Sequence, residues 1–314
     1  MRPKLGQVGS RLAAGWQVGR LYPRLLVGIA IILGVALIAA FAPLLAPENP
    51  ELAHPGAILQ APSAAHLLGT DSSGMDVLSR LIYAPRIDLT LAVSATVLAI
   101  AIGLPLGLVA GYYDNWLTSV VLRISDIVQS FPVFVLGMAL VVLSGQKIIN
   151  VVGVVALVQA PIYIRLLRSQ SLYVRGRTFI EATRASGLSD RQIMLRHVLP
   201  NSMGPVFAMA SVTVGTAMLL TAGLSFVGAG VRVPTPEWGS MISIGAPSLI
   251  DNGAWWPSVP PGIMLALTVM GFGMVGDALS EVTDPRRRRS ARRPPSASEP
   301  APAAGMVTVA PGPD

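Results

Sequence analysis

Few residues of this 314-residue chain have the types and spacing that catalysis requires. The three histidines, His54, His66 and His197, are too scattered for an H-E-x-x-H zinc motif. Gly276-Asp277 alone is weak evidence for an intramembrane aspartyl protease. The chain also has no cysteine and no G-x-x-x-x-G-K-[ST] loop to hold nucleotide phosphates. The sequence therefore predicts no catalytic residue, no metal site and no cofactor bound by this chain.

Asp71 and Asp76 are a second possible source of chemistry. Paired aspartates occur in hydrolases and in calcium sites, but too few further oxygen ligands lie near these two in the sequence. The neighbouring Gly69, Thr70 and Gly74 are typical of turns, which aspartate side chains often cap. We therefore expect capped turns here, followed by a short amphipathic helix over residues 76–83.

The most informative stretch is a polar, basic segment, Thr178 to Pro200, between two long apolar stretches. Thr178 with Glu181, and Ser189 with Gln192, have the Ser/Thr-x-x-Glu/Gln spacing of a capping box. The two pairs predict two short helices within the segment.

Gly187 lies where the first of these helices must stop, and glycine enters the left-handed conformation at little cost. Pro200 is predicted to end the second helix, with Asn201 or Ser202 capping the next one. The first helix then has about two turns, which is too short for stability in water alone. We expect a partner to hold it.

The segment resembles the cytoplasmic EAA loop of permeases of ATP-binding-cassette (ABC) importers. The resemblance is carried by Glu181, Ala182, Gly187, Leu199 and Pro200. RHVLPN, residues 196–201, is similar to the dipeptide and oligopeptide branch in particular. The sequence departs from the family at Thr183, which replaces the second alanine, and at His197, where isoleucine is frequent.

In that family the loop forms a coupling helix that docks into a groove of the ATPase subunit. The resemblance implies that the residues coupling this chain to an ATPase are Glu181, Ala182, Thr183, Ser186, Gly187 and Leu188. Those expected to cap or end the helices of the loop are Thr178, Ser189, Gln192 and Pro200. From these residues alone, an ordinary basic hairpin between two membrane spans is the alternative.

The composition is that of a membrane protein with several spans. Hydrophobic residues make up 52% of the chain, charged residues 12%, and the mean hydropathy is +0.61. The net charge of +7 and the pI near 10.4 would suggest nucleic acid in a soluble protein. In a membrane protein such a charge more often reports orientation, so we expect no nucleic-acid partner.

Apolar stretches predict an all-α protein with six transmembrane helices. They cover about 25–46, 87–111, 116–143, 148–167, 203–227 and 259–279. The first is longer than a signal-peptide core, so we interpret it as an uncleaved helix. In the third, Pro132 is expected to kink the helix, and Arg123 is spaced to pair with Asp126.

These helices predict a domain organisation. In chain order the predicted parts are a cytoplasmic segment 1–24, the first helix 25–46, an extracytoplasmic segment 47–86, a permease domain 87–281 with five helices and the coupling loop 169–202, and a basic, disordered cytoplasmic tail 282–314. All but four of the 23 Lys and Arg residues lie on the side of the loop and the termini. By the positive-inside rule that side is cytoplasmic.

Two further blocks, residues 66–86 and 224–242, resemble the peptide-importer branch, although Met75 stands where arginine is usual. The resemblance implies that an extracytoplasmic binding protein delivers substrate to loops 47–85 and 229–257. The residues expected to contact it are Asp71, Asp76, Pro236, Glu237 and Trp238.

The resemblance thus implies a permease subunit with the type I ABC importer fold in a bacterial cytoplasmic membrane. The resemblance implies as partners a second homologous permease chain, one or two ABC ATPase subunits that bind ATP and Mg²⁺, and a binding protein. Its implied substrates are short peptides, with nickel chelates, haem or glutathione as alternatives. An ion-coupled secondary carrier is an alternative of another class, but no clear repeats or buried mid-span charges favour it. A membrane enzyme is disfavoured by the missing metal or nucleophile constellation.

Overall fold

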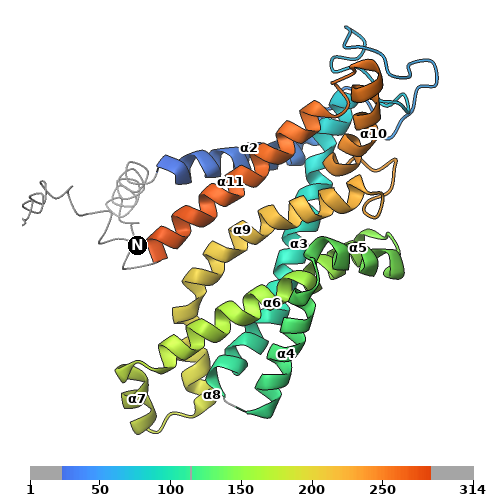
Figure 1. Ribbon diagram of the computed structural model, residues 1–314. Coiled ribbons are helices and arrows are strands. Elements are labelled where there is room, and N and C mark those ends of the chain that lie inside the picture. The colour runs from blue at the N-terminus through green and yellow to red at the C-terminus, as the bar shows by residue number, and fades with distance from the viewer. Residues whose placement is uncertain (1–22, 114, 284–314) are drawn as a thin grey trace, which may run out of the picture.

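The computed structural model describes residues 23–113 and 115–283, where the regular elements are all helical. The predicted terminal segments 1–24 and 282–314 lie almost entirely outside these residues. In chain order the helices are α2 (Pro23–Leu45), α3 (Val77–Tyr112), α4 (Trp116–Ser130), α5 (Val133–Ser144), α6 (Ile148–Arg175), α7 (Thr178–Ala185), α8 (Asp190–Ile193), the π-helical turn η1 (Met194–Val198), α9 (Leu199–Phe226), α10 (Trp238–Asn252) and α11 (Val259–Thr283). Figure 1 shows α7 and α8 at one end of the molecule and α10 at the other.

Within the described residues, five helical stretches are long and apolar enough to cross a membrane. They are α2, α3, α6, the continuous run from α8 to α9, and α11. The predicted third span is instead the pair α4 and α5, bent by 96° and counted as a sixth span only if taken together. Pro132 stands at the break, where Phe131 is extended because a residue before proline avoids the helical conformation. The expected kink is thus a full break.

Helix α3 corrects the prediction of a short helix over 76–83 followed by a separate span. It is one helix of 36 residues that contains Pro85. A proline deprives the carbonyl four residues earlier of its helical donor, here that of Leu81. The indole Nε1 of Trp238 donates to this carbonyl at 3.3 Å. The donor from a distant segment replaces the missing bond, and the helix continues.

The helix after the polar segment also continues where the sequence predicted an end at Pro200. It runs without interruption from Asp190 to Phe226, with the π-helical turn η1 immediately before the proline. The wider turn accommodates the residue that lacks an N–H. Asn201 and Ser202 do not cap a helix, since their side chains donate back to the carbonyls of the residues four positions earlier.

The predicted pairing of Arg123 with Asp126 within α4 was also wrong. Asp126 of α4 pairs with Arg165 of α6 at 2.7 Å, rather than with Arg123 one turn earlier. Both partners are about half exposed, so the ion pair contributes little to stability.

The most extensive helix contact in the described residues is between α3 and α6, which run in parallel. Three glycines spaced four apart on α3 face α6: Gly103, Gly107 and Gly111. A Cβ atom added at any of them would lie 2.5–2.6 Å from an α6 atom. Such a stripe of small residues lets two membrane helices pack backbone to backbone.

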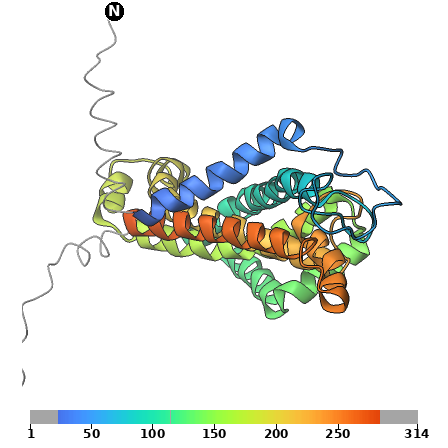
Figure 2. The same cartoon turned by 90° about the horizontal axis from the view of Figure 1, so that it is seen from above.

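The other side of the bundle is formed by α2, α9 and α11. Figures 1 and 2 both show α2 lying along α11, and here the backbones meet where Gly28 faces Gly271. Helix α11 also packs against α9, with Gly276 against Ala208 and Val212. The main apolar core lies between α3, α6 and α9 and includes Leu91, Val155 and Met218.

The glycine stripe gives a stability prediction. Gly107→Ala places a methyl group 2.6 Å from the Ile164 carbonyl oxygen, which is fixed in the backbone. We expect a loss of about 1–3 kcal/mol, measured as a lower unfolding temperature in a fixed detergent. Gly153→Ala on α6 meets nothing within 4 Å and is the matched control. It should be neutral or stabilise by up to about 1 kcal/mol. Equal effects of the two changes would contradict the close α3–α6 contact.

Candidate functional site

The part of the predicted coupling loop 169–202 that lies between α6 and η1, residues 176–193, is called the coupling loop from here on; it packs on an apolar cluster at the end of the bundle. Helix α7 has only eight residues, and Ile180 is its one buried side chain. Ile180 is 1% exposed. It packs in a cluster with Leu108, Tyr112, Val174, Ile193 and Val198. The short helix is therefore held by the ends of α3 and α6, as its length requires.

The opposite face of α7 is open to solvent. Phe179 is 44% exposed, and Glu181 and Ala182 beside it are exposed as well. Of the other residues predicted to couple to an ATPase, Ser186 and Gly187 are exposed, and Thr183 and Leu188 are half-buried. The structure thus places all six predicted coupling residues in one short, largely exposed loop.

The first predicted capping box is wrong. Arg177 is the N-cap of α7, Thr178 is already its first helical residue, and no side chain caps this end. The cause is the preceding turn, since α6 runs on to Arg175 and leaves only two residues before α7 begins. Glu181 lies in the first turn, where a carboxylate interacts favourably with the positive end of a helix.

The turn between α7 and α8 has the predicted backbone. Gly187 adopts φ = +82°, and its N–H donates to the Arg184 carbonyl at 3.0 Å. Ser189 and Gln192 form a capping box at the start of α8, with the Ser189 N–H donating to Gln192 Oε1 at 3.0 Å. The chain therefore reverses direction sharply after α7.

A polar cluster that sequence reasoning missed joins this turn to α3. The Tyr112 hydroxyl donates to Asp190 Oδ1 at 2.6 Å and accepts from Arg184 Nη2 at 3.1 Å. Arg175 Nη1 donates to the Tyr112 carbonyl at 2.7 Å. These side chains line a groove of about 580 Å³. The hydrogen bond that Arg184 donates to the Tyr112 hydroxyl raises the pKa of Arg184 above its usual value.

At the other end of the bundle, Arg80 joins three segments. It is fully buried near the start of α3, and its Nη1 donates to the carbonyls of Pro50 at 3.1 Å and Pro234 at 2.9 Å. Its Nε lies 3.7 Å from Asp71 Oδ2. Met75 is buried with its sulfur against the same guanidinium. One buried cation thus fixes the loop before α3 to the loop before α10.

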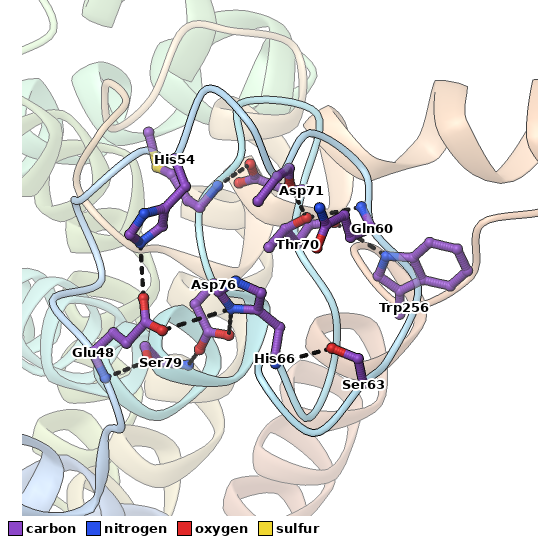
Figure 3. A network of polar contacts seen from close by, with 12 residues as sticks. Glu48, His54, Gln60, Ser63, His66, Thr70, Asp71, Asp76, Ser79 and Trp256 are labelled. Atoms are coloured by element: carbon purple, nitrogen blue, oxygen red, sulfur yellow. Dashed lines mark hydrogen bonds and ion pairs between the residues drawn. The ribbon is translucent and has the colours of Figure 1, made fainter.

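Figure 3 shows a network of carboxylates and histidines in the loop before α3 and at the start of that helix. Glu48 binds His54 at 2.9 Å, and His66 Nδ1 lies 3.0 Å from Asp76 Oδ1 and 3.7 Å from Glu48. Asp76 also caps α3 by accepting from the Ser79 N–H at 2.8 Å. No group of three or more ligand side chains in the described ranges is arranged to hold a metal ion. Asp71 likewise accepts from the backbone N–H groups of Ser73 and Met75. Asp71 therefore caps a turn, and Asp76 caps a helix.

Glu237 and Trp238 connect α10 to α3. The Glu237 carboxylate accepts from the N–H groups of Gly239 at 3.0 Å and Ser240 at 2.7 Å, and so caps α10. The Trp238 N–H donates to Asp88 Oδ2 at 3.3 Å. Burial raises the pKa of Glu237 above its usual value. These contacts hold the start of α10 against α3.

The five residues predicted to contact a binding protein are accordingly not on the surface. Asp71, Asp76, Pro236, Glu237 and Trp238 are all buried in the chain. Their side chains shape the loops and are not free to meet another protein. Exposed charge lies instead around a cleft of about 760 Å³ between the end of α2 and the start of α3, lined by Glu51 and Arg86 among others.

Comparison with known proteins adds to this geometry. Residues 103–289 match the family described as binding-protein-dependent transport system inner membrane component. A dipeptide transport system permease of Alkalihalophilus pseudofirmus is 39% identical over 263 residues, which cover 84% of this chain and 86% of that protein. A di/tripeptide permease of Pseudomonas aeruginosa is 36% identical, covering 84% and 88%. A glutathione permease of Pectobacterium atrosepticum is 36% identical, covering 72% and 75%.

The role of Arg80 is testable. Arg80→Leu removes the donor of two loop carbonyls and leaves Asp71 without its buried cation, so we expect a loss of roughly 3 kcal/mol in unfolding free energy. Hydrogen exchange should rise in residues 47–51 and 232–236. Arg86→Leu, an exposed arginine on the same helix, should stay within about 0.5 kcal/mol of the parent. Unchanged exchange in both loops of the Arg80 variant would contradict this role.

Proposed function

Because the chain belongs to the family of binding-protein-dependent transport system inner membrane components, we propose that it is the permease subunit of an ATP-driven importer of short peptides. The observation that carries this proposal is the seating of α7. One face of this short helix is fixed to the ends of α3 and α6 through Ile180, and the other is exposed. When a partner moves a helix that is fixed on one face and exposed on the other, the bundle to which the helix is fixed moves with it.

The energy must come from partner subunits. The chain has no phosphate-binding loop in its sequence, so ATP and Mg²⁺ belong on one or two ABC ATPase subunits that grip the exposed face of α7. Phe179 offers that face a large apolar side chain, and Glu181 and Ala182 lie next to it. The permease chain itself is then no enzyme, although the complete complex hydrolyses ATP.

A second, homologous permease chain completes the pathway across the bilayer in this proposal, and no nucleic acid takes part. The binding protein docks on the outer loops. Because the five residues first expected to meet it are buried, exposed charges such as Glu51 and Arg86 around the outer cleft are the better candidates. Opposite charges on the two partners would guide this docking.

The orientation follows from the distribution of basic residues. The coupling loop and both termini face the cytoplasm of a bacterium, and the α10 end faces outward. Arg165, Arg168 and Arg175 all lie on the half of α6 next to the coupling loop, which adds basic residues to the proposed cytoplasmic side.

The proposed substrates are dipeptides and other short peptides. This class is supported by relatives that are named for dipeptides and for di- and tripeptides and that cover most of this chain. Glutathione, itself a tripeptide, is a second candidate because a glutathione permease is also 36% identical. Mass spectrometry of the ligand bound to the purified complex distinguishes the two.

The orientation can be checked by labelling, since the chain has no cysteine of its own. Ser186→Cys in the coupling loop should react with a membrane-impermeant maleimide only after the cytoplasmic side is opened. Ala61→Cys in the loop before α3 should react in intact cells. Both positions are exposed in the structure, so accessibility alone does not separate them. Reversed labelling would contradict the proposed orientation.

The coupling role can be tested by a pair of glycines in one loop. Gly187→Ala forces a side chain into φ = +82°, which costs roughly 1 kcal/mol, and should tilt α7 from its partner. Gly176→Ala is the matched control, because Gly176 has φ = −78° and its added Cβ meets only ordinary contacts. In the assembled complex, the Gly187 variant should lose about two- to fivefold in transport and in ATP hydrolysis stimulated by loaded binding protein.

Two controls accompany this pair of variants, and two outcomes would contradict the proposed role. The amount of each variant in the membrane must match the parent, and the isolated chain should show no ATP hydrolysis. Gly187→Ala with parental transport would mean that the loop is an ordinary hairpin. Uptake into liposomes that contain this chain alone, driven by an ion gradient, would favour a secondary carrier.

A further inference from the structure

Tyr112 is the last residue of α3 and lies outside the coupling loop, yet its hydroxyl touches both sides of the loop's turn. It donates to Asp190 at the start of α8 and accepts from Arg184 in the last turn of α7. These two residues flank Gly187, and they are also 3.5 Å from each other. The Tyr112 hydroxyl, Asp190 and Arg184 are therefore each in contact with the other two across the turn.

The rest of the tyrosine is fixed to the bundle. The residue is 2% exposed, and its ring belongs to the apolar cluster that seats Ile180. The Arg175 guanidinium at the end of α6 lies 5.7 Å from the ring centroid and also binds the backbone carbonyl of Tyr112. The hydroxyl thus has a defined position relative to α3 and α6 before it meets the loop.

The apolar cluster around Ile180 and the Tyr112 hydroxyl constrain α7 in different ways. Apolar contact is not directional, so Ile180 holds α7 against the bundle but does not fix its rotation. Hydrogen bonds to a carboxylate and a guanidinium are directional and stronger than neutral ones. The contacts at Tyr112 can therefore set the angle at which α7 presents its free face.

We propose that Tyr112 is a positioning residue that sets the angle of the coupling helix and passes its movement to α3. This inference rests on the proposed function for its consequence in transport. The opposite end of α3 is fixed to the outer loops by Arg80, which donates to the carbonyls of Pro50 and Pro234. Helix α3 thereby joins the loop that a partner ATPase would move to the loops that a binding protein would touch.

The test is Tyr112→Phe, which keeps the ring in its cluster and removes only the hydroxyl. Tyr113→Phe is the matched control, since Tyr113 is the neighbouring residue and is 37% exposed. The first measurement uses spin labels at Val109→Cys on α3 and at Ala185→Cys on α7 in the assembled transporter; Ala185 is not among the residues predicted to couple to the ATPase. Both positions are exposed, and the chain has no other cysteine. The distance distribution should broaden in the Tyr112 variant and stay narrow in the control.

The second measurement is the ratio of ATP hydrolysis with and without loaded binding protein. This ratio should fall about tenfold in Tyr112→Phe, the factor that corresponds to losing one charge-assisted hydrogen bond. Asp190→Ala should act in the same direction, and the double variant should lose less than the sum of the two single effects, because both single changes remove the Tyr112–Asp190 hydrogen bond. A residue that only stabilised the fold would lower the amount of protein and leave the ratio unchanged.

An unchanged distance distribution together with a parental ratio in Tyr112→Phe would overturn the inference. So would equal damage from Tyr113→Phe. If the parental complex itself shows no stimulation by a binding protein, the proposed function fails instead. The spin-label distances then still decide whether Tyr112 positions the loop.

Discussion

The backbone contact between α3 and α6 is the constraint on which the functional end of the molecule depends. The two helices run in parallel, and three glycines let them approach closely. Their C-terminal ends consequently lie together, and Tyr112 from one and Val174 from the other pack against Ile180. An eight-residue helix has no stability of its own in water. The geometry of the coupling loop is thus inherited from a contact in the membrane.

Much of the fold and of the loop could be predicted because the relevant features are local. Apolar stretches mark membrane helices, and a glycine after a short polar helix marks a left-handed turn, which Gly187 adopts. The break at Pro132 follows from proline chemistry in the same way. The family resemblance of the loop is supported by the match over residues 103–289.

Several of the failures come from contacts between residues far apart in the chain. Pro85 does not end a helix because an indole 157 positions away from Leu81 replaces the missing donor. Nothing in the sequence around Tyr112 indicates that its hydroxyl meets Asp190, 78 residues later. Glu237 has the residue type of a surface contact, yet it is buried as a helix cap. Local patterns predict which residues can bond but not which distant partner is within reach.

The length of α3 has a consequence for where its two ends lie. A helix of 36 residues is about 54 Å long at about 1.5 Å per residue, whereas the hydrocarbon layer of a bilayer is only about 30 Å thick. Unless it tilts steeply, α3 must project into the headgroup layer or beyond it on both faces. Arg80 and Tyr112, near its opposite ends, then lie outside the hydrocarbon layer. The charged groups that they contact there avoid the full cost of transfer into lipid. The helix that connects the two loops is long enough to place both of its polar contacts outside the hydrocarbon layer, although the protein itself buries Arg80 and Tyr112.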